Sequence, residues 1–246
     1  MVRAGSMWTY NVTRASIRRV GITLIPDSDV PVDEKELLRA ALQHGSASQD
    51  YYCIKTHEYL PADFPNTKII CNYRDVRDAM LSHMRFMHLD FELGLQMVQA
   101  YMDLTDHYCG QPGSNVMKIR YDDMVAQPVQ MVREINRFLG FDIDKRDAKQ
   151  IAKKYAKNEV RKILKTLGKV ELDSAGEPLR NEQANDYTSA LNVDGTRRAY
   201  HRKTGFSENH ITSTSSGEWR SVLDPQQQER LIALSRDWLL RYGFEL

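Results

Sequence analysis

Long apolar segments are absent from this chain of 246 residues: no run approaches the length that crosses a bilayer, and the N-terminus lacks the apolar core of a signal peptide. A charge excess of one sign is also missing, because 34 Lys and Arg residues oppose 33 Asp and Glu residues, a formal net charge of +1. Such a balance supplies no overall field that would recruit nucleic acid or a membrane. We therefore predict a soluble cytoplasmic protein that binds neither, and in which local groups of Lys and Arg bind any anion.

Cysteine is scarce. The three cysteines, Cys53, Cys71 and Cys109, are an odd number without metal-ligand spacing, and two of them lie in apolar, strand-like segments. Buried, reduced thiols are the expected state, and no metal is predicted. The Walker sequence G-x-x-x-x-G-K-[ST] is absent as well, which disfavours a P-loop nucleotide kinase.

Hydrophobic residues make up 41% of the chain, enough for the core of one domain. Over the first 140 residues, short apolar segments typical of strands alternate with helical patterns. Strands are predicted at 21–25, 51–55, 68–73 and 115–121, and helices after Thr9 and at 33–43, 76–89, 91–108 and 129–139. This alternation predicts an α/β fold, with three layers and a central parallel sheet flanked by helices.

The rest of the chain is more polar. Residues 147–167 are highly charged with a helical pattern, whereas 168–216 show no regular pattern and are predicted to be a lid or an acceptor-binding segment. Asp224-Pro225 is expected to begin a last helix that ends near Gly243. Residues 1–246 are thus predicted to form a single domain.

Two of the predicted strands end in groups suited to a phosphate or a sulfate. Lys55-Thr56-His57 follows one strand, where the cation can stabilise a transferring anion while the imidazole accepts a proton. Arg74 follows another, and Ser82 comes eight residues later, so that one phosphate can be held between guanidinium and hydroxyl. The alternatives are a histidine that only packs, and a surface ion pair of Arg74 with Asp75 or Asp78.

The segment Arg3-Ala4-Gly5-Ser6-Met7-Trp8-Thr9 precedes a helical pattern. A Gly-Ser turn at the start of a helix presents backbone N–H groups and hydroxyls to a phosphate, assisted by the helix dipole. An ordinary surface turn before a helix has the same appearance.

Together these segments resemble the PAPS-dependent sulfotransferase family of the bacterial or cytosolic type. The family's 5′-phosphosulfate loop is similar to the segment from Arg3 to Trp8, its Lys-Thr-His motif to Lys55-Thr56-His57, and its 3′-phosphate motif to the segment from Arg74 to Ser82. Three further similarities are Tyr121-Asp122-Asp123-Met124, Pro128 through Phe138-Leu139-Gly140, and Gly217-Glu218-Trp219-Arg220. The matching segments follow the family's order.

The resemblance implies a P-loop-like sulfotransferase fold, and an enzyme that moves a sulfuryl group from PAPS to a hydroxyl or an amine of a small-molecule acceptor, releasing PAP. In that reading His57 is the base, and Lys55 and Arg3 neutralise charge on the transferring group. The implied cofactor-binding residues are Arg3, Gly5, Ser6, Met7, Trp8, Thr9, Arg74, Ser82, Tyr121, Thr212, Ser213 and Thr214.

The chain departs from the family in several places. Arg3 stands where many members have a lysine, Met7 replaces a hydroxyl residue, and only Met1-Val2 stand where a strand precedes the loop, so a shortened start or another anchor for the loop is expected. Thr212-Ser213-Thr214 stands where the family has Arg-Lys-Gly, so a cation that binds the 3′-phosphate is missing. Hydroxyls or a nearby basic residue are expected to replace it. The basic candidates are Arg197, Arg198, Arg202 and Lys203. A non-catalytic PAP-binding protein on a degenerate sulfotransferase scaffold is therefore the alternative function.

The acceptor site is expected to be lined by the segment after His57, by the helix around His83, Phe86 and Met87, and by 168–216. Acidic groups in the last segment favour a polar acceptor such as a natural product, although a solvated loop explains them equally well. His83 and His88 are expected to pack or to contact the acceptor rather than to catalyse. Nothing in the sequence indicates the oligomeric state.

Overall fold

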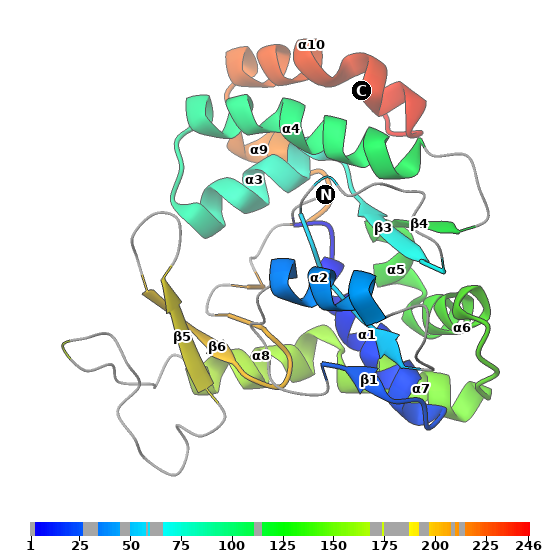
Figure 1. Cartoon of the computed structure of the whole chain (residues 1–246). Coiled ribbons are helices and arrows are strands. Elements are labelled where there is room, and N and C mark those ends of the chain that lie inside the picture. Colours follow the sequence, from blue (N-terminus) through cyan, green and yellow to red (C-terminus); the bar gives the residue numbers. More distant parts are fainter. Residues whose placement is uncertain are drawn as a thin grey trace. The chain divides into compact units, whose positions relative to one another are not determined.

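The computed structural model (Figure 1) describes residues 3–26, 34–44, 50–57, 59, 66–110, 115–167, 174, 187–191, 197–207, 210–211 and 215–246. The chain divides into two compact units. Unit 1 comprises Met1–Thr9, His57–Met131 and Thr212–Leu246, and unit 2 comprises Tyr10–Thr56 and Val132–Ile211. No helix within the described ranges is both long and apolar enough to span a membrane. The single domain over 1–246 stays a prediction.

Unit 1 contains a parallel strand pair, β3 (Ile69–Tyr73) and β4 (Val116–Arg120), in which Ile69 lies opposite Val116 and Tyr73 opposite Arg120. Both strands were predicted, but β4 ends one residue early because Tyr121 begins a short helix. The acidic residues in the first turn of that helix interact favourably with its dipole. The helices of this unit are α3 (Val76–Met87), α4 (Phe91–Cys109), α5 (Tyr121–Ala126), α9 (Trp219–Val222) and α10 (Pro225–Arg241).

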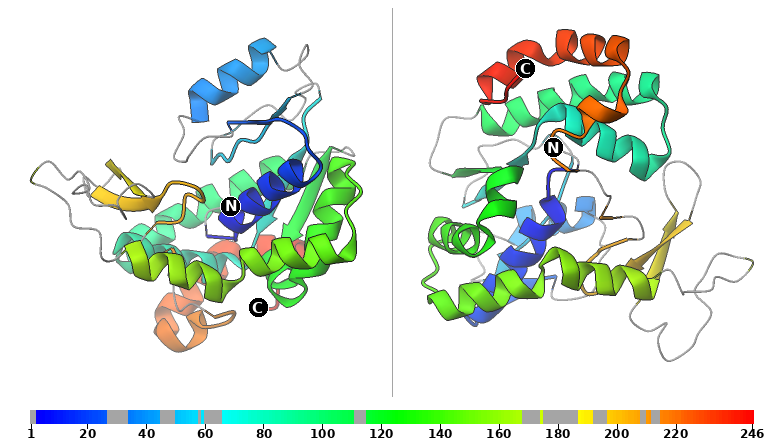
Figure 2. Two further views of the ribbon diagram at one scale, coloured as in Figure 1. Left: turned by 90° about the horizontal axis from the view of Figure 1, so that it is seen from below. Right: turned by 180° about the vertical axis from the view of Figure 1, so that it is seen from behind.

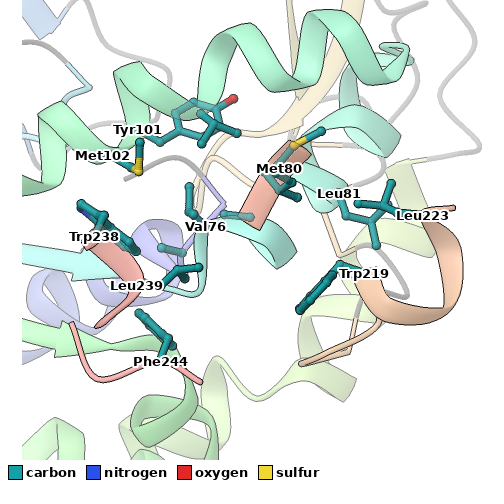
Figure 3. Packing of buried hydrophobic residues seen from close by; sticks show 14 of the residues in the cluster. Val76, Met80, Leu81, Tyr101, Met102, Trp219, Leu223, Trp238, Leu239 and Phe244 are labelled. Atoms are coloured by element: carbon teal, nitrogen blue, oxygen red, sulfur yellow. The ribbon is translucent and has the colours of Figure 1, made fainter. Parts of the chain in front are cut away.

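The core of unit 1 forms where α3, α4 and α10 meet. Figures 1 and 2 show α10 along α4, and the close view in Figure 3 shows the side chains between them. The buried side chains labelled there are Val76, Met80, Leu81, Tyr101, Met102, Trp219, Leu223, Trp238, Leu239 and Phe244. Burying this many large apolar groups stabilises the unit and fixes the start of α3, which directly follows β3.

Unit 2 contains a parallel pair of β1 (Leu24–Ile25) and β2 (Tyr51–Tyr52) and an antiparallel pair of β5 (Tyr187–Leu191) and β6 (Arg197–His201). Its core includes Val12, Ile17, Ile135 and Ile151. Its helices are α2 (Glu34–His44), α7 (Lys145–Lys154), α8 (Lys157–Leu167) and most of α1 (Ser6–Arg19) and α6 (Pro128–Leu139).

Four predictions about elements need correction. The strand predicted at 51–55 is only the two residues of β2. The strand at 21–25 is reduced to β1, because Gly21 (φ +76°) and Ile22 close the end of α1, where their N–H groups bond to the carbonyls of Arg18 and Ile17. The helical region at 147–167 is two helices interrupted at Tyr155, whose side chain is buried. The predicted irregular segment 168–216 contains the β5–β6 hairpin, whose strands mix polar and small residues and so lack a hydrophobic pattern.

Candidate active site

Arg74 follows β3 directly, and its side chain is only 3% exposed. Its Nε and Nη2 atoms are buried without a hydrogen-bond partner among the residues that the structure describes. The guanidinium carbon lies 4.4 Å from the centre of the Tyr121 ring, which supports the cation through a cation–π contact but accepts none of its in-plane N–H donors. Buried donors of a charged group cost free energy when they are unpaired, so this guanidinium is prepared to bind an anion.

The neighbouring acidic residues have other partners. Asp75 caps α3 and forms a salt bridge of 2.8 Å with Arg77, whose guanidinium lies over the Trp219 ring. The alternative of an ordinary surface ion pair is therefore wrong, because Arg74 is buried and Asp75 pairs with Arg77. Asp78 is buried too and feels the Arg74 charge, which partly offsets the rise in its pKa that burial causes.

Asp78 connects α3 to the turn before α9. Its side chain is 1% exposed, and its Oδ2 atom accepts a hydrogen bond of 2.8 Å from the backbone N–H of Gly217. Burial raises the pKa of Asp78, against the lowering effects of this hydrogen bond and of the nearby Arg74 charge. The carboxylate therefore holds the turn in place.

The same turn has two further attachments. The Ser216 hydroxyl donates to Asp122 of α5 at 2.6 Å, and Arg85 of α3 donates to Glu218 at 2.7 Å. The hydrogen bond from Arg85 lowers the pKa of Glu218. The predicted cofactor residues Thr212, Ser213 and Thr214 lie outside the described residues, but the turn that follows them is tied to α3 and α5.

Ser82 lies two turns along α3 from Arg74 and is 2% exposed. Its Oγ atom accepts a hydrogen bond of 3.2 Å from Nε of Arg3, and the Arg3 guanidinium lies 4.5 Å from the centre of the Phe86 ring. Two predicted site residues that are 79 positions apart in the sequence are thus in direct contact. Phe86, expected near the acceptor, supports this cation.

The segment predicted as a phosphate loop closes tightly onto α5. Gly5 has φ +85°, and a Cβ added to it would lie 2.5 Å from Cε of Met124 and 3.2 Å from the Tyr121 ring. A side chain at this position would strain the left-handed backbone, and the end of Met124 and the Tyr121 ring would have to shift to admit it. The N–H groups of Trp8 and Thr9 bond to the Gly5 carbonyl as α1 begins, and helix starts of this kind present their first N–H groups to anions.

The remaining loop residues are partly or fully buried. Ser6, Met7 and Trp8 are half-buried, whereas Thr9 is buried and its Oγ1 atom accepts a hydrogen bond of 2.8 Å from Nδ2 of Asn72 in β3. Thr9 is thereby fixed to the strand that leads to Arg74. The sequence reasoning missed Asn72 because an amide inside an apolar strand has no motif to mark it.

The structure places Lys55, half-buried, in unit 2, and His57, exposed, in unit 1. Arg202 and Lys203, candidates for the missing cation, also belong to unit 2, as do Arg197 and Arg198. The catalytic roles of Lys55, His57 and Arg3 stay predictions, as does each assignment of a cofactor contact.

His83 packs against Tyr101 of α4, as expected for a residue outside catalysis: its Nδ1 atom and the Tyr101 hydroxyl form a hydrogen bond, and the two rings stack at 5.6 Å. Burial raises the pKa of Tyr101, against the effect of the nearby positive charge of Arg3. Asp78 and Asp122 belong to segments with family resemblance but had been given no role there, and Arg85 lies three residues beyond such a segment. Only their spacing in the sequence from Arg74 and Tyr121 could have indicated that they lie near the site.

A buried cation at a strand end and a helix start that is free of acidic residues are both features that suit a phosphate-bearing ligand. The model of the Sulfotransferase family matches residues 23–145, which is half of the chain. The chain belongs to this family.

Two solved structures share the fold. Mouse sulfotransferase SULT7A1 complexed with PAP matches with a TM-score of 0.63 and 18% identity, over 96% of this chain and 80% of that one. Retinol dehydratase in complex with androsterone and the inactive cofactor PAP matches with a TM-score of 0.57 and 13% identity, over 99% of this chain and 79% of that one. No curated protein matches the chain in sequence. The predicted α/β sulfotransferase fold is confirmed.

Proposed function

We propose that this chain is a PAPS-dependent sulfotransferase that moves a sulfuryl group from PAPS to a hydroxyl or an amine of a small acceptor and releases PAP. The observation that carries the proposal is the buried guanidinium of Arg74, whose Nε and Nη2 lack partners among the described residues. The 3′-phosphate is the group that distinguishes PAPS from common adenine nucleotides, and a planar guanidinium suits it. Both similar structures were solved with PAP.

The 3′-phosphate would be held by Arg74 together with the hydroxyl of Ser82 and the turn fixed by Asp78. The segment from Gly5 to Thr9 at the start of α1 would hold the 5′-phosphosulfate through backbone N–H groups. Tyr121, already in contact with Arg74 and next to Gly5, would lie beside the adenine, and Trp8 would stack on it.

In the transfer step His57 accepts the proton of the acceptor while the acceptor oxygen or nitrogen bonds to sulfur and the bond from sulfur to the phosphate oxygen breaks. Lys55 and Arg3 neutralise the charge that builds on the sulfuryl oxygens and on the leaving phosphate. A positioned cation of this kind commonly lowers the activation barrier by about 3 kcal/mol. Arg3 neutralises charge but, unlike lysine, is a poor proton donor.

For the acceptor we propose a small polar molecule, contacted in part by residues 168–216 acting as a lid within a single domain. The proposed acceptor class rests on the acidic residues of that segment, Glu177, Glu182 and Asp186.

The first experiment is a calorimetric titration of the protein with PAP and, separately, with ADP. We expect micromolar binding of PAP and binding of ADP that is weaker by at least about tenfold, since ADP lacks the 3′-phosphate. Equal affinities would show that no 3′-phosphate site exists and would overturn the proposal.

The second experiment separates an enzyme from a non-catalytic PAP-binding protein. Turnover of PAPS is measured with a panel of small hydroxyl and amine acceptors for the parent protein, for His57→Asn and for His107→Asn, a matched change in α4 outside the candidate site. We expect His57→Asn to lower kcat by about 10²-fold or more while PAP affinity stays within about twofold, and His107→Asn to retain turnover. Tight PAP binding without turnover of any acceptor, or loss of PAP binding in His57→Asn, would favour the binding protein.

A further inference from the structure

Two thiols that the proposed function does not use lie against each other in unit 1. Cys71 is the central residue of β3, and Cys109 is the last residue of α4. Their Sγ atoms are 3.0 Å apart, although the residues are 38 positions apart in the sequence. A disulfide bond is about 2.05 Å long, so a movement of about 1 Å would join them.

The surroundings of the pair are apolar apart from hydroxyl tips. Cys71 is 5% and Cys109 2% exposed, and they share a cluster with Leu104 and Tyr108, while Tyr242 packs against it. Water and other nucleophiles are therefore scarce around the sulfur atoms, so Cys109 is the thiol in position to react with an oxidised Cys71.

The two thiols differ in their ionisation. Cys109 donates its S–H to Sγ of Cys71, and this hydrogen bond lowers the pKa of Cys71 and raises that of Cys109. The ammonium of Lys118, which lies opposite Cys71 in the register of β4, also lowers the pKa of Cys71. Since the thiolate is the reactive form, Cys71 is the nucleophile of the pair.

Cys53 provides a contrast within the same chain. It lies in unit 2, is buried, and burial raises its pKa to about 12. Burial without an activating thiol makes Cys53 an unreactive reference for the other two.

We propose that Cys71 and Cys109 form an oxidisable dithiol, a modification site at which a hydroperoxide produces an internal disulfide. The sulfur of Cys71 attacks the terminal oxygen of the hydroperoxide, the O–O bond breaks, and an alcohol (water from hydrogen peroxide) leaves with the Cys71 proton. The sulfur of Cys109 then attacks the resulting sulfenic acid, the S–S bond forms, and the hydroxyl leaves as water with the Cys109 proton. The two thiols lose two electrons, which reduce the peroxide.

The disulfide would connect the middle of β3 to the end of α4. A cross-link between residues this far apart restricts the unfolded chain, so the oxidised protein should be the more stable form. For a chain of this length we expect its Tm to rise by about 5–10 °C over that of the reduced protein.

The test uses the reduced full-length protein treated with a small excess of hydrogen peroxide, then denatured and alkylated with N-ethylmaleimide. We expect the oxidised protein to carry one N-ethylmaleimide adduct where the reduced protein carries three, and the polypeptide itself to be about 2 Da lighter from the loss of two hydrogens. Peptide mapping should find Cys71 joined to Cys109. Cys53→Ser should behave in the same way, whereas Cys71→Ser and Cys109→Ser should form no internal disulfide. The same treatment in guanidinium chloride should lose the selectivity for this pair.

Three results would overturn the proposal: a disulfide that involves Cys53, a cross-link between two copies of the chain as the main product, or thiols that stay reduced when the peroxide oxidises a model thiol in the same tube. None of these readouts depends on PAP or on turnover, so the outcome is independent of the proposed function.

Discussion

Helices α3 and α7 carry charged residues in opposite ways. In α3 eight consecutive residues from Val76 to His83 are buried, and they include Arg77 and Asp78. In α7 the buried residues are Ala148, Ile151 and Ala152, and most of its basic residues are exposed. A buried charge must have a partner or it destabilises the fold, whereas an exposed one is satisfied by water. The buried charges of α3 therefore indicate a candidate functional site, whereas the exposed charges of α7 do not.

The strongest test of this contrast between buried and exposed charges replaces one buried arginine, Arg74 just before α3, and one exposed arginine, Arg161 of α8. Arg74→Ala should raise the Kd for PAP by about 30-fold or more, because a charge-assisted contact of about 2 kcal/mol is lost. Arg161→Ala removes an equal charge from the exposed surface of α8 and should change the Kd by less than about twofold. Calorimetry at one ionic strength measures both, and thermal melts verify folding. Equal losses of PAP affinity in the two variants would mean that PAP binding depends on the overall charge of the protein rather than on Arg74.

A second comparison uses two buried hydrogen bonds of the same kind. In unit 1 Asn72 donates to the hydroxyl of Thr9, and in unit 2 Asn136 donates to the hydroxyl of Ser16, each at 2.8 Å. Thr9→Val and Ser16→Ala should each lower the free energy of unfolding by about 1–3 kcal/mol, because an amide donor loses a partner.

Only Thr9→Val should also weaken PAP binding, by several-fold, since Thr9 joins the loop at the start of α1 to β3. Denaturant unfolding and PAP titration of both variants provide the check. If Ser16→Ala weakens PAP as much as Thr9→Val does, the effect on PAP reports general destabilisation rather than the loop.

Two of the carboxylates that hold the turn before α9, those of Asp78 and Glu218, should change its stability with pH in opposite directions. The folded pKa of Asp78 is raised, so its contribution to stability falls as the pH rises above its ordinary value of 3.8. The folded pKa of Glu218 is lowered, so its contribution is present above its ordinary value of 4.5 and is lost as the pH falls toward the folded pKa.

Relative to the parent protein, Asp78→Asn should therefore gain stability as the pH rises above 3.8, and Glu218→Gln should lose stability as the pH rises through 4.5. Thermal melts between about pH 3.5 and 6.5 measure the two differences. If the stability difference from the parent protein changes with pH in the same direction for both variants, the environments described for these side chains are wrong.

The smallest effect is expected at the surface. Arg19 and Asp147 form a two-pronged salt bridge at 2.5 and 2.7 Å in unit 2, yet both side chains reach solvent. Arg19→Ala should shift Tm by no more than about 2 °C and should leave PAP binding unchanged, because water replaces an exposed partner. A larger loss of stability in Arg19→Ala than in Thr9→Val would contradict the view that buried interactions stabilise this protein more than exposed ones.

Much of this architecture was predictable from local patterns. The apolar strand before Arg74 and the helix after it are separated by two residues, so the position of Arg74 at the end of a strand followed from the chain itself. Long periodic helices such as α4 and α10 were predicted to within one or two residues. The hairpin β5–β6 was missed, because its pairing depends on backbone hydrogen bonds that leave no hydrophobic pattern.

The α/β alternation, the chemical groups at the ends of two strands and the motifs shared with sulfotransferases can all be read along the chain, because each is formed by residues close together in sequence. Folding in three dimensions is what pairs Asp75 with Arg77 and leaves Arg74 without that partner, brings Arg3 to Ser82, and brings Cys71 to Cys109. These pairings depend on which side chains are buried together. Burial determines whether a charge or a thiol finds a partner or water, and no local pattern contains that information.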